Sequence, residues 1–310
     1  MKCSFEGGRP ALRILVTGGS GFIGQAAVTE LVRRGHTVIA TARAVAESLP
    51  ALPGLTWVAW DGMRQPVPAI AFRGMTAILH LAVPESPFSF PEKNEALFRL
   101  EIETSFRLLE EARIHGVKRV LFASTGDVLG ASASPALESD RHYRPDSFYG
   151  TSKACLELLA SAYKNVLQTS VFRFYHPYGP GGEKFLINRL FSKVAEQQEI
   201  VLEPPDGILV NPVWTDDLAQ GIALAVESEA DGIFHFGGPD TLRLREMIML
   251  MAALLKVPAR IRLNDRPCVD RHAGDFRRAA EILGYHPAVR LREGLMRLME
   301  TAAFSGPIRS

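Results

Sequence analysis

Short runs of apolar residues alternate along the first half of the chain with stretches in which apolar positions recur at helical spacing. The runs have the length of buried strands, and the stretches between them are long enough for crossover helices. The runs that predict strands cover residues 12–17, 37–42, 55–60, 77–82, 119–124 and 170–174. The stretches that predict helices cover residues 22–34, 66–73, 91–115 and 150–164. This alternation predicts an α/β protein with a doubly wound parallel sheet.

The pattern changes after residue 175, and the later segments predict a smaller, mainly helical C-terminal lobe. Its elements in order are a helix near 183–197, a strand–helix unit over 209–227, a short strand at 233–237, and mostly helix to the end. We therefore expect a first domain at 1–175, to which 208–236 returns. The lobe would be made of 176–207 and 237–310.

A glycine-rich segment follows the first predicted strand and opens the first predicted helix. Its sequence from Thr17 to Gly24 is TGGSGFIG. Glycine permits a tight turn and a close approach of the backbone to a pyrophosphate, and a helix N-terminus offers free N–H groups to an anion. The motif therefore predicts a dinucleotide site in a Rossmann-like first domain, with the lobe holding the substrate. The residues expected to contact the dinucleotide here are Gly18, Ser20, Gly21, Phe22, Ile23 and Gly24.

The end of the second predicted strand bears on the choice of dinucleotide. An acid at this point would bind the adenosine 2′-hydroxyl of NAD, and the chain has Arg43 there instead. A guanidinium can bind a 2′-phosphate through two hydrogen bonds, so Arg43 favours NADP, with NAD the less favoured cofactor. The alternative is that Arg43 is a solvated loop residue without such a role.

A tyrosine and a lysine are predicted to lie on one face of the helix at 150–164. Tyr149 and Lys153 are four residues apart, so their side chains are neighbours. The pKa of a free tyrosine is near ~10, and an adjacent ammonium together with an oxidised nicotinamide would stabilise the phenolate. The hydroxyls of Ser124 and Thr125 end the fifth predicted strand, where a doubly wound sheet opens its ligand crevice. Acid/base chemistry is predicted there, the alternative being a surface pair of helical residues.

These motifs resemble the extended short-chain dehydrogenases/reductases, the NAD-dependent epimerase/dehydratase family, over nearly the whole chain. TGGSGFIG is similar to the family's TGxxGxxG loop, residues 124–130 (STGDVLG) to its S-S/T-x-x-V-Y-G segment, and Tyr149 with Lys153 to its YxxxK pair. Residues 173–181, 213–219 and 283–287 are similar to R-x-x-N-x-Y-G-P, V-x-V-D-D-x-A and LGW-x-P. The resemblance implies that the catalytic residues are Thr125, Tyr149 and Lys153. It adds Asp61, Leu81, Ala82 and Lys153 to the cofactor contacts.

The departures from the family pattern concern the substrate. His176 stands where many sugar-nucleotide enzymes of the family have Asn, and residues 209–212 lack an arginine that often grips a substrate phosphate. The resemblance to hexose 4,6-dehydratases is incomplete as well, because Gly126-Asp127 replaces their Asp-Glu pair, which disfavours dehydration. Whether His176 contacts substrate or is a packed core histidine stays open. The residues expected to line the substrate site are Ser124, Thr125, His176, Tyr178 and Trp214.

Composition excludes several other classes of function. The 35 Lys and Arg residues nearly balance 34 Asp and Glu residues, without a dense basic run, which argues against nucleic acid as a partner. The longest apolar run, 247–255, is too short to span a bilayer. Cys3, Cys155 and Cys268 are far apart and, like the histidines, do not have metal-ligand spacing. We expect a cytoplasmic protein without a metal site, and a homodimer stays open.

The sequence as a whole favours an enzyme that moves a hydride between nicotinamide and a secondary alcohol or ketone carbon of a small-molecule substrate. An NADPH-dependent ketoreductase acting on a substrate less charged than a nucleotide sugar is the first hypothesis. A nucleotide-sugar epimerase or reductase is the alternative that uses the same groups. A non-catalytic NADP-binding regulatory protein is the alternative of another class, although such proteins typically lack the Tyr–Lys pair.

Overall fold

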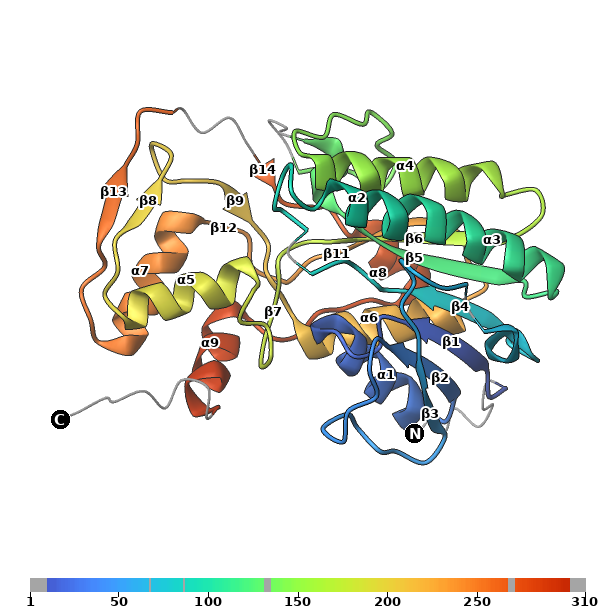
Figure 1. The fold of residues 1–310 in the computed structure, drawn as a ribbon. Helices are drawn as coiled ribbons and strands as arrows, with labels where there is room; N and C mark the ends of the chain where they lie inside the picture. Colours follow the sequence, from blue (N-terminus) through green and yellow to red (C-terminus); the bar gives the residue numbers. More distant parts are fainter. Residues whose placement is uncertain (1–9, 67, 86, 131–134, 267–270, 302–310) are drawn as a thin grey trace, which may run out of the picture.

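The computed structural model describes residues 10–66, 68–85, 87–130, 135–266 and 271–301. Its centre is a parallel sheet of seven strands in the order β11-β6-β5-β4-β1-β2-β3 (Figure 1). These strands are β1 (Arg13–Thr17), β2 (Thr37–Ala42), β3 (Leu55–Ala59), β4 (Ala77–His80), β5 (Arg119–Thr125), β6 (Gln168–Phe174) and β11 (Gly232–Phe236). All six strands predicted in the first domain are present, and the doubly wound α/β fold class is confirmed.

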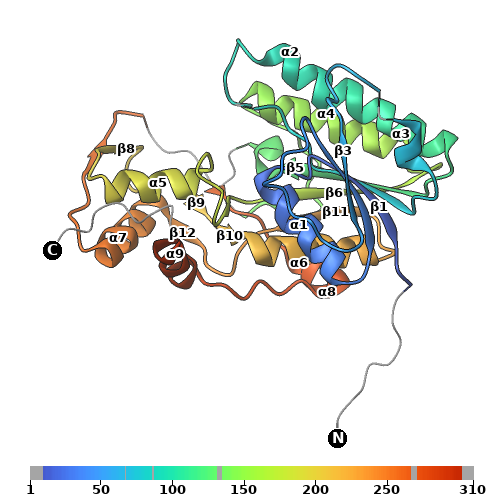
Figure 2. The same cartoon turned by 60° about the horizontal axis from the view of Figure 1, so that its bottom comes forward.

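Helices cover both faces of this sheet (Figure 2). On one face lie α1 (Phe22–Arg33), α6 (Thr215–Glu227) and α8 (Arg277–Leu283), and on the other lie α2 (Asn94–Leu97), α3 (Ser105–Ile114) and α4 (Phe148–Ala162). Successive strand residues point to opposite faces, so Leu121 joins the apolar cluster under α1 and α6 while Val120 joins the cluster under α3 and α4. Two buried faces explain why the strands read as nearly continuous apolar runs.

Two predicted helices differ from the structure. The stretch 66–73 forms only a four-residue 3₁₀ turn, η1 (Ala69–Phe72). The helix predicted at 91–115 is interrupted between α2 and α3 by a π-helical segment, η2 (Phe98–Thr104). The apolar spacing continues through this segment, which is why periodicity alone did not reveal it.

The lobe is built on three helices, α5 (Leu186–Ala195), α7 (Leu244–Leu255) and α9 (Leu291–Glu300), around an apolar cluster of its own. The lobe is mainly helical, as predicted, but it also contains strands of two or three residues. These strands are too short to produce an alternation of apolar and polar residues in the sequence. They are β7 (Pro177–Tyr178) with β10 (Val213–Trp214), β8 (Ile200–Leu202) with β13 (Ile261–Leu263), and β9 (Leu209–Val210) with β12 (Leu242–Arg243) and β14 (Arg271–His272).

Helix α8 corrects the predicted boundary of the lobe. The sequence assigned all of 237–310 to the lobe, but α8 contacts β11 and α6. Its Ala279 and Leu283, together with Tyr285, are buried in the cluster beneath the sheet. The apolar face of this short helix is therefore part of the core of the first domain.

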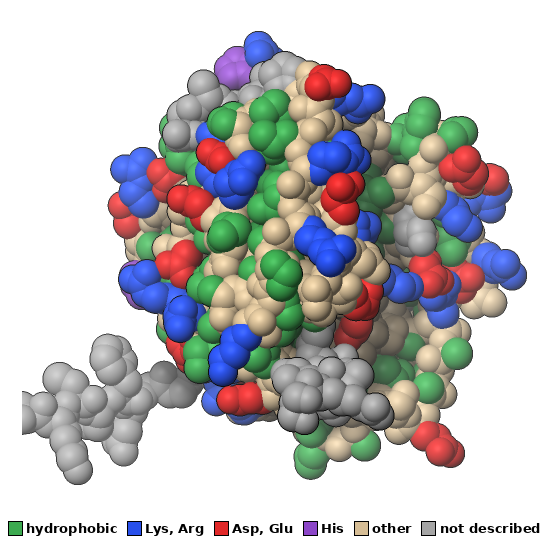
Figure 3. Space-filling model, turned by 90° about the vertical axis from the view of Figure 1, so that its left-hand side faces the viewer, with side chains coloured by type: hydrophobic (Ala, Val, Ile, Leu, Met, Phe, Trp, Pro, Cys, Tyr) green, Lys and Arg blue, Asp and Glu red, His purple; other side chains and the backbone are tan. Residues whose placement is uncertain are grey.

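Several sequence expectations concern features other than the fold. No helix in the described ranges is long and apolar enough to cross a membrane. The same residues contain no group of three His, Cys, Asp or Glu side chains that could hold a metal ion. Cys155 is a free thiol, whereas Cys3 and Cys268 lie outside the described residues. Acidic and basic side chains are interspersed on the outer face of the lobe (Figure 3).

A buried network of charges fixes α4 against the sheet. Arg173 on β6 and Glu157 on α4 are joined by two hydrogen bonds, from Nε to Oε1 at 3.0 Å and from Nη2 to Oε2 at 2.7 Å. Both side chains are almost completely buried. Ser124 Oγ donates to Glu157 at 2.6 Å, and Tyr143 Oη donates to it at 3.0 Å. Every carboxylate oxygen is thus satisfied, which is the condition under which a buried ion pair is tolerated.

We expect Glu157→Gln to destabilise the protein by about 3–5 kcal/mol, because it leaves the guanidinium of Arg173 buried without a counter-charge. Denaturant unfolding followed by circular dichroism measures this change. Glu95→Gln, which removes half of an exposed ion pair with Arg99, is the matched control and should leave the unfolding midpoint almost unchanged. Equal effects of the two substitutions would contradict the structural role of the network.

Candidate functional site

The glycine loop joins β1 to α1 as the sequence predicted. Gly18 has φ +73°, and the N–H of Gly21 closes the turn on the Gly18 carbonyl at 3.0 Å. A Cβ on Gly24 would lie 2.1 Å from that same carbonyl oxygen, so only glycine lets the helix start this close to the turn. Helix α1 begins after Gly21 without a side-chain cap, which leaves its first N–H groups for an anion.

The end of β4 lies directly against this loop. A Cβ on Gly18 would lie 2.5 Å from both the nitrogen and the Cα of Ala82, and 2.8 Å from the Leu81 carbonyl carbon. Three predicted cofactor residues from distant parts of the sequence are therefore brought together. Ser20, Phe22 and Ile23 are half-buried at the start of α1, and the Phe22 ring packs on Phe185 of the lobe at 4.7 Å between centroids.

Two further residues predicted to contact the cofactor follow strands β2 and β3. Arg43 follows β2 with a side chain that is 66% exposed, and its Nη2 lies 3.7 Å from Oε2 of Glu85. Glu85 also pairs with Lys184 of the lobe at 2.7 Å. Arg43 is thus available to a ligand but faces a carboxylate that competes for it. Asp61 follows β3 and accepts the N–H of Met63 at 3.1 Å.

Helix α4 brings Tyr149 and Lys153 to the end of β5. Ser147 caps the helix by accepting the N–H of Gly150 at 3.0 Å. One turn later Lys153 Nζ donates to the Ala123 carbonyl at 2.9 Å, and it lies 5.9 Å from the centre of the Tyr149 ring. Thr125 is the last residue of β5 and is half-buried. The predicted acid/base group is therefore assembled at the carboxyl end of the sheet.

Lys153 has a second partner that sequence reasoning missed. Glu101, in the π-helical segment η2, places Oε2 2.8 Å from Lys153 Nζ, and the side chains of the two residues are 0% and 4% exposed. Burial raises the pKa of the Glu101 carboxyl, and the ammonium opposes that rise. Glu101 lies between Arg99 and Glu103 in the sequence, so it looks like one more charged residue of an exposed helix face and was not singled out.

The pKa of Tyr149 departs from the expectation. The adjacent ammonium was expected to lower it, but the pKa is raised well above 10.0, first by desolvation and then by the charges of Glu101 and Asp127. Burial of the phenol is therefore the main reason for the difference. Phe88, 70% exposed, packs edge-on against the Tyr149 ring at 4.9 Å between centroids and is a second residue that the sequence did not single out.

The residues predicted to line the substrate site differ in how far they are buried. His176, at φ +48°, is half-buried between β6 and β7. Tyr178 and Trp214 are 0% and 3% exposed, and they pack on each other in the lobe core at 5.3 Å between ring centroids. The expectation that these two line the substrate site is corrected, because neither has surface to offer a ligand. Ser124 is also buried and donates to Glu157.

Gly126, next to Thr125, has no room for a side chain. A Cβ there would lie 2.4 Å from Cε1 of Tyr175. A Cβ on Gly274 would lie 2.2 Å from Cε2 of the same ring, so the ring is held between two glycines. An acid at position 126 is therefore excluded by packing.

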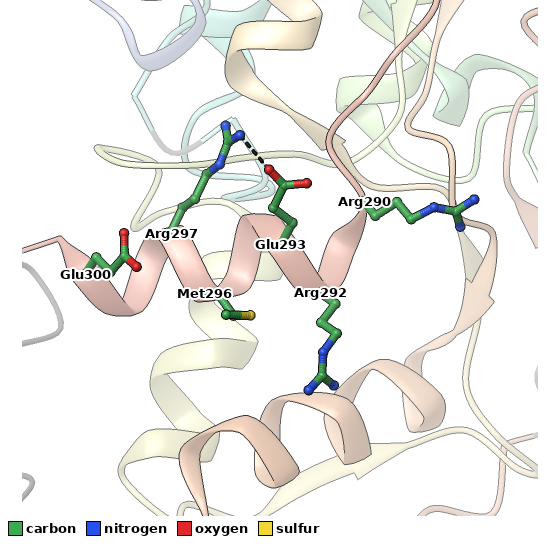
Figure 4. Close-up of a pocket in the computed structure, with 6 residues that line it drawn as sticks. All are labelled: Arg290, Arg292, Glu293, Met296, Arg297 and Glu300. Atoms are coloured by element: carbon green, nitrogen blue, oxygen red, sulfur yellow. Dashed lines mark hydrogen bonds and ion pairs between the residues drawn. The ribbon is translucent and has the colours of Figure 1, made fainter.

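A surface hollow of about 420 Å³ lies on α9, away from these residues (Figure 4). Two of its arginines are already paired, Arg297 with Glu293 at 2.6 Å and Arg290 with Asp240 at 2.7 Å. None of the predicted catalytic or cofactor residues lines this hollow.

Known proteins that are similar to this chain match it over most of its length. A sequence model of the family described as "NAD dependent epimerase/dehydratase family" matches residues 14–236. The dTDP-glucose 4,6-dehydratase of Streptomyces griseus is 30% identical over 303 residues, covering 91% of each chain. The dTDP-4-dehydro-6-deoxyglucose reductase of Escherichia coli is 25% identical over 309 residues, covering 93% of this chain and 96% of the relative. The structure of MoeE5 in complex with UDP-glucuronic acid and NAD superposes with a TM-score of 0.80 at 27% identity, covering 92% of this chain and 97% of MoeE5.

Proposed function

Since the chain belongs to the NAD dependent epimerase/dehydratase family, we propose that it oxidises or reduces a secondary alcohol or ketone carbon of a nucleotide sugar. The observation that carries this proposal is the position of Lys153 Nζ, which donates to the Ala123 carbonyl of β5 and lies 5.9 Å from the centre of the Tyr149 ring. Thr125 is the last residue of the same strand.

The loop fits a nicotinamide dinucleotide on physical grounds. Gly18 and Gly24 let the loop pack closely on Ala82 and on the start of α1, and that start offers N–H groups to a pyrophosphate. When bound, the dinucleotide supplies or accepts the hydride. Lys153 would bind its ribose hydroxyls, and Asp61, Leu81 and Ala82 would line its adenosine and nicotinamide sides.

The chain's own residues would handle the proton and the oxygen. Thr125 would orient the reacting oxygen by a hydrogen bond, and Tyr149 would give it a proton during reduction or take one during oxidation. The intact Tyr–Lys pair argues against a non-catalytic regulator. His176, half-buried beside β7, is proposed as a substrate contact.

Reduction or epimerisation is favoured over dehydration. The relatives named above include a dTDP-sugar dehydratase and a dTDP-sugar reductase. Elimination in the dehydratases uses an Asp-Glu pair after the catalytic threonine, and here Tyr175 excludes any side chain at Gly126. The reductase or epimerase chemistry needs only the groups that the site contains.

A second candidate function is the NADPH-dependent reduction of a less charged ketone. Asn211 lies in the segment 209–212, where an arginine would grip a substrate phosphate. Its side chain instead exchanges two hydrogen bonds with the backbone of Gly274, at 3.0 and 3.2 Å. This side chain is therefore committed to the fold and is not available to a pyrophosphate.

For the cofactor we propose NADP(H), on the strength of Arg43. Its exposed guanidinium lies at the end of β2, where a 2′-phosphate would be read. Glu85 opposes this preference by pairing with Arg43, although both side chains are exposed and such pairs are weak.

Thermal-shift measurements with saturating cofactor distinguish the two substrate classes. We expect UDP or dTDP to raise the melting temperature, because a ligand at 100 times its Kd stabilises a protein by about 2.7 kcal/mol. Inorganic pyrophosphate is the control for a plain anion effect. Stabilisation by neutral hydroxyketones and none by the nucleotides would replace the first proposal with the second.

Tyr149→Phe tests the acid/base assignment. The substitution should leave cofactor affinity nearly unchanged and lower kcat by about 10²- to 10⁴-fold, since only the proton-carrying hydroxyl is removed. Lys153→Met is the companion variant and should damage both kcat and cofactor binding. Steady-state kinetics and cofactor fluorescence provide the two readouts. Substantial turnover by Tyr149→Phe would contradict the assignment of Tyr149 as the acid/base.

Arg43→Ala tests the choice of dinucleotide. Loss of charge-assisted hydrogen bonds worth about 1.5–3 kcal/mol should weaken NADPH binding about 10- to 100-fold and leave NADH binding nearly unchanged. Titration calorimetry measures both. Arg113→Ala, which removes an exposed arginine paired with Glu110, is the control. An unchanged NADPH/NADH ratio in Arg43→Ala would show that the guanidinium does not read the phosphate.

A further inference from the structure

The ammonium of Lys153 is enclosed between a carbonyl and a carboxylate. Nζ donates to the Ala123 oxygen at 2.9 Å and lies 2.8 Å from Glu101 Oε2. The Glu101 side chain is completely buried. Neither oxygen of this carboxylate has a hydrogen-bond partner among the described residues, so its contact with Lys153 is an ion pair. A carboxylate held in this way interacts with Lys153 far more strongly than a surface pair would.

The π-helical segment accounts for the position of Glu101. Leu97 and Leu100 pack inward from α2 and η2, and Thr104 Oγ1 fixes the other end of η2 by donating to the Gly62 carbonyl at 2.7 Å. The interruption of the helix thus places an acid on the face that packs against α4. Single-turn π segments of this kind often occur at functional sites.

The Glu101–Lys153 pair has no net charge whichever atom holds the shared proton. A carboxylate with an ammonium and a carboxylic acid with an amine are equally neutral as a unit. Tyr149 therefore has a neutral pair beside it, where a lone lysine would present a cation.

The other titratable groups described beside this cluster, His80 and Asp127, supply no positive charge. His80 of β4 is buried, and its desolvation, with the charge of Lys153 added, lowers its pKa to about 3, so the imidazole is neutral at ordinary pH. Its Nδ1 is hydrogen-bonded to Thr17 Oγ1 at 2.6 Å. Asp127, after β5, bears a negative charge that disfavours the phenolate of Tyr149.

We propose that Glu101 is a positioning residue that compensates Lys153, keeps Tyr149 in its phenol form, and so favours ketone reduction over alcohol oxidation at neutral pH. This inference rests on the function proposed above. In reduction the hydride adds to the carbonyl carbon, the C=O π pair moves onto oxygen, and that oxygen takes the proton of Tyr149. The phenolate then regains a proton from water. Oxidation requires the phenolate first, and Glu101 disfavours its formation.

The first experiment titrates Tyr149 directly, without substrate or cofactor. Carbon-13 labelling of the tyrosine Cζ gives one NMR resonance for each of the six tyrosines, and Tyr149→Phe identifies the one that is lost. In wild-type protein Tyr149 should remain protonated beyond the ordinary value of about 10. In Glu101→Gln the uncompensated ammonium should lower the midpoint by about one to three units. Glu103→Gln, the same change two residues away, should leave it in place.

The second experiment measures kcat against pH in both directions. In wild-type protein the kcat of oxidation should rise with pH as Tyr149 loses its proton. Glu101→Gln should move this rise to lower pH by about one to three units, as in the NMR titration. At neutral pH the ratio of the oxidation kcat to the reduction kcat should therefore increase about tenfold or more. Glu103→Gln should keep the wild-type profile. Identical profiles for Glu101→Gln and wild type would overturn the proposal.

The two experiments separate this inference from the proposed function. If no nucleotide sugar or ketone is turned over, the proposed function fails, while the NMR titration still decides the role of Glu101. If Glu101→Gln does not fold, the wild-type titration still tests the proposal, because a Tyr149 midpoint below about 10 would contradict it.

Discussion

Helix α4 is anchored to the carboxyl ends of β5 and β6 by buried charges, and the proposed chemistry depends on that anchorage. Lys153 reaches the Ala123 carbonyl, and Glu157, one turn further along, is joined to Arg173. The helix cannot rotate without breaking both contacts. Tyr149, at its first turn, is therefore held at the end of β5.

Each of the two buried cations on this interface has its own carboxylate. Arg173 is matched by Glu157 and Lys153 by Glu101, as expected where an uncompensated charge would be costly. The match at Lys153 has a chemical consequence that the match at Arg173 lacks, because Tyr149 lies beside it. A site in which the lysine is neutralised stabilises the protonated tyrosine, which is the form needed to donate to a ketone oxygen.

The sequence predicted the sheet, the glycine loop and the Tyr–Lys pair, because each is specified by local patterns: apolar runs, glycine spacing, and a four-residue interval on a helix. The failures arose where tertiary contacts decide. Glu101 lies in a segment whose periodicity reads as continuous helix, so its turn toward Lys153 is visible only in three dimensions. Tyr178 and Trp214 lie within segments that resemble those of the family, and both are buried in the lobe core. Helix α8 packs on the sheet, although its neighbours in the sequence belong to the lobe.

Similarity to a relative over the whole chain does not determine which reaction a site performs, and Gly126 illustrates this. The chain is 30% identical to a dTDP-glucose 4,6-dehydratase, which would suggest elimination as its reaction. Tyr175 occupies the space beside Gly126, and Gly274 supports the ring from its other edge, so an acid could enter only if the ring and its support moved together. The fold that the two proteins share is compatible with either reaction. The steric constraint at Gly126 favours hydride and proton transfer without elimination.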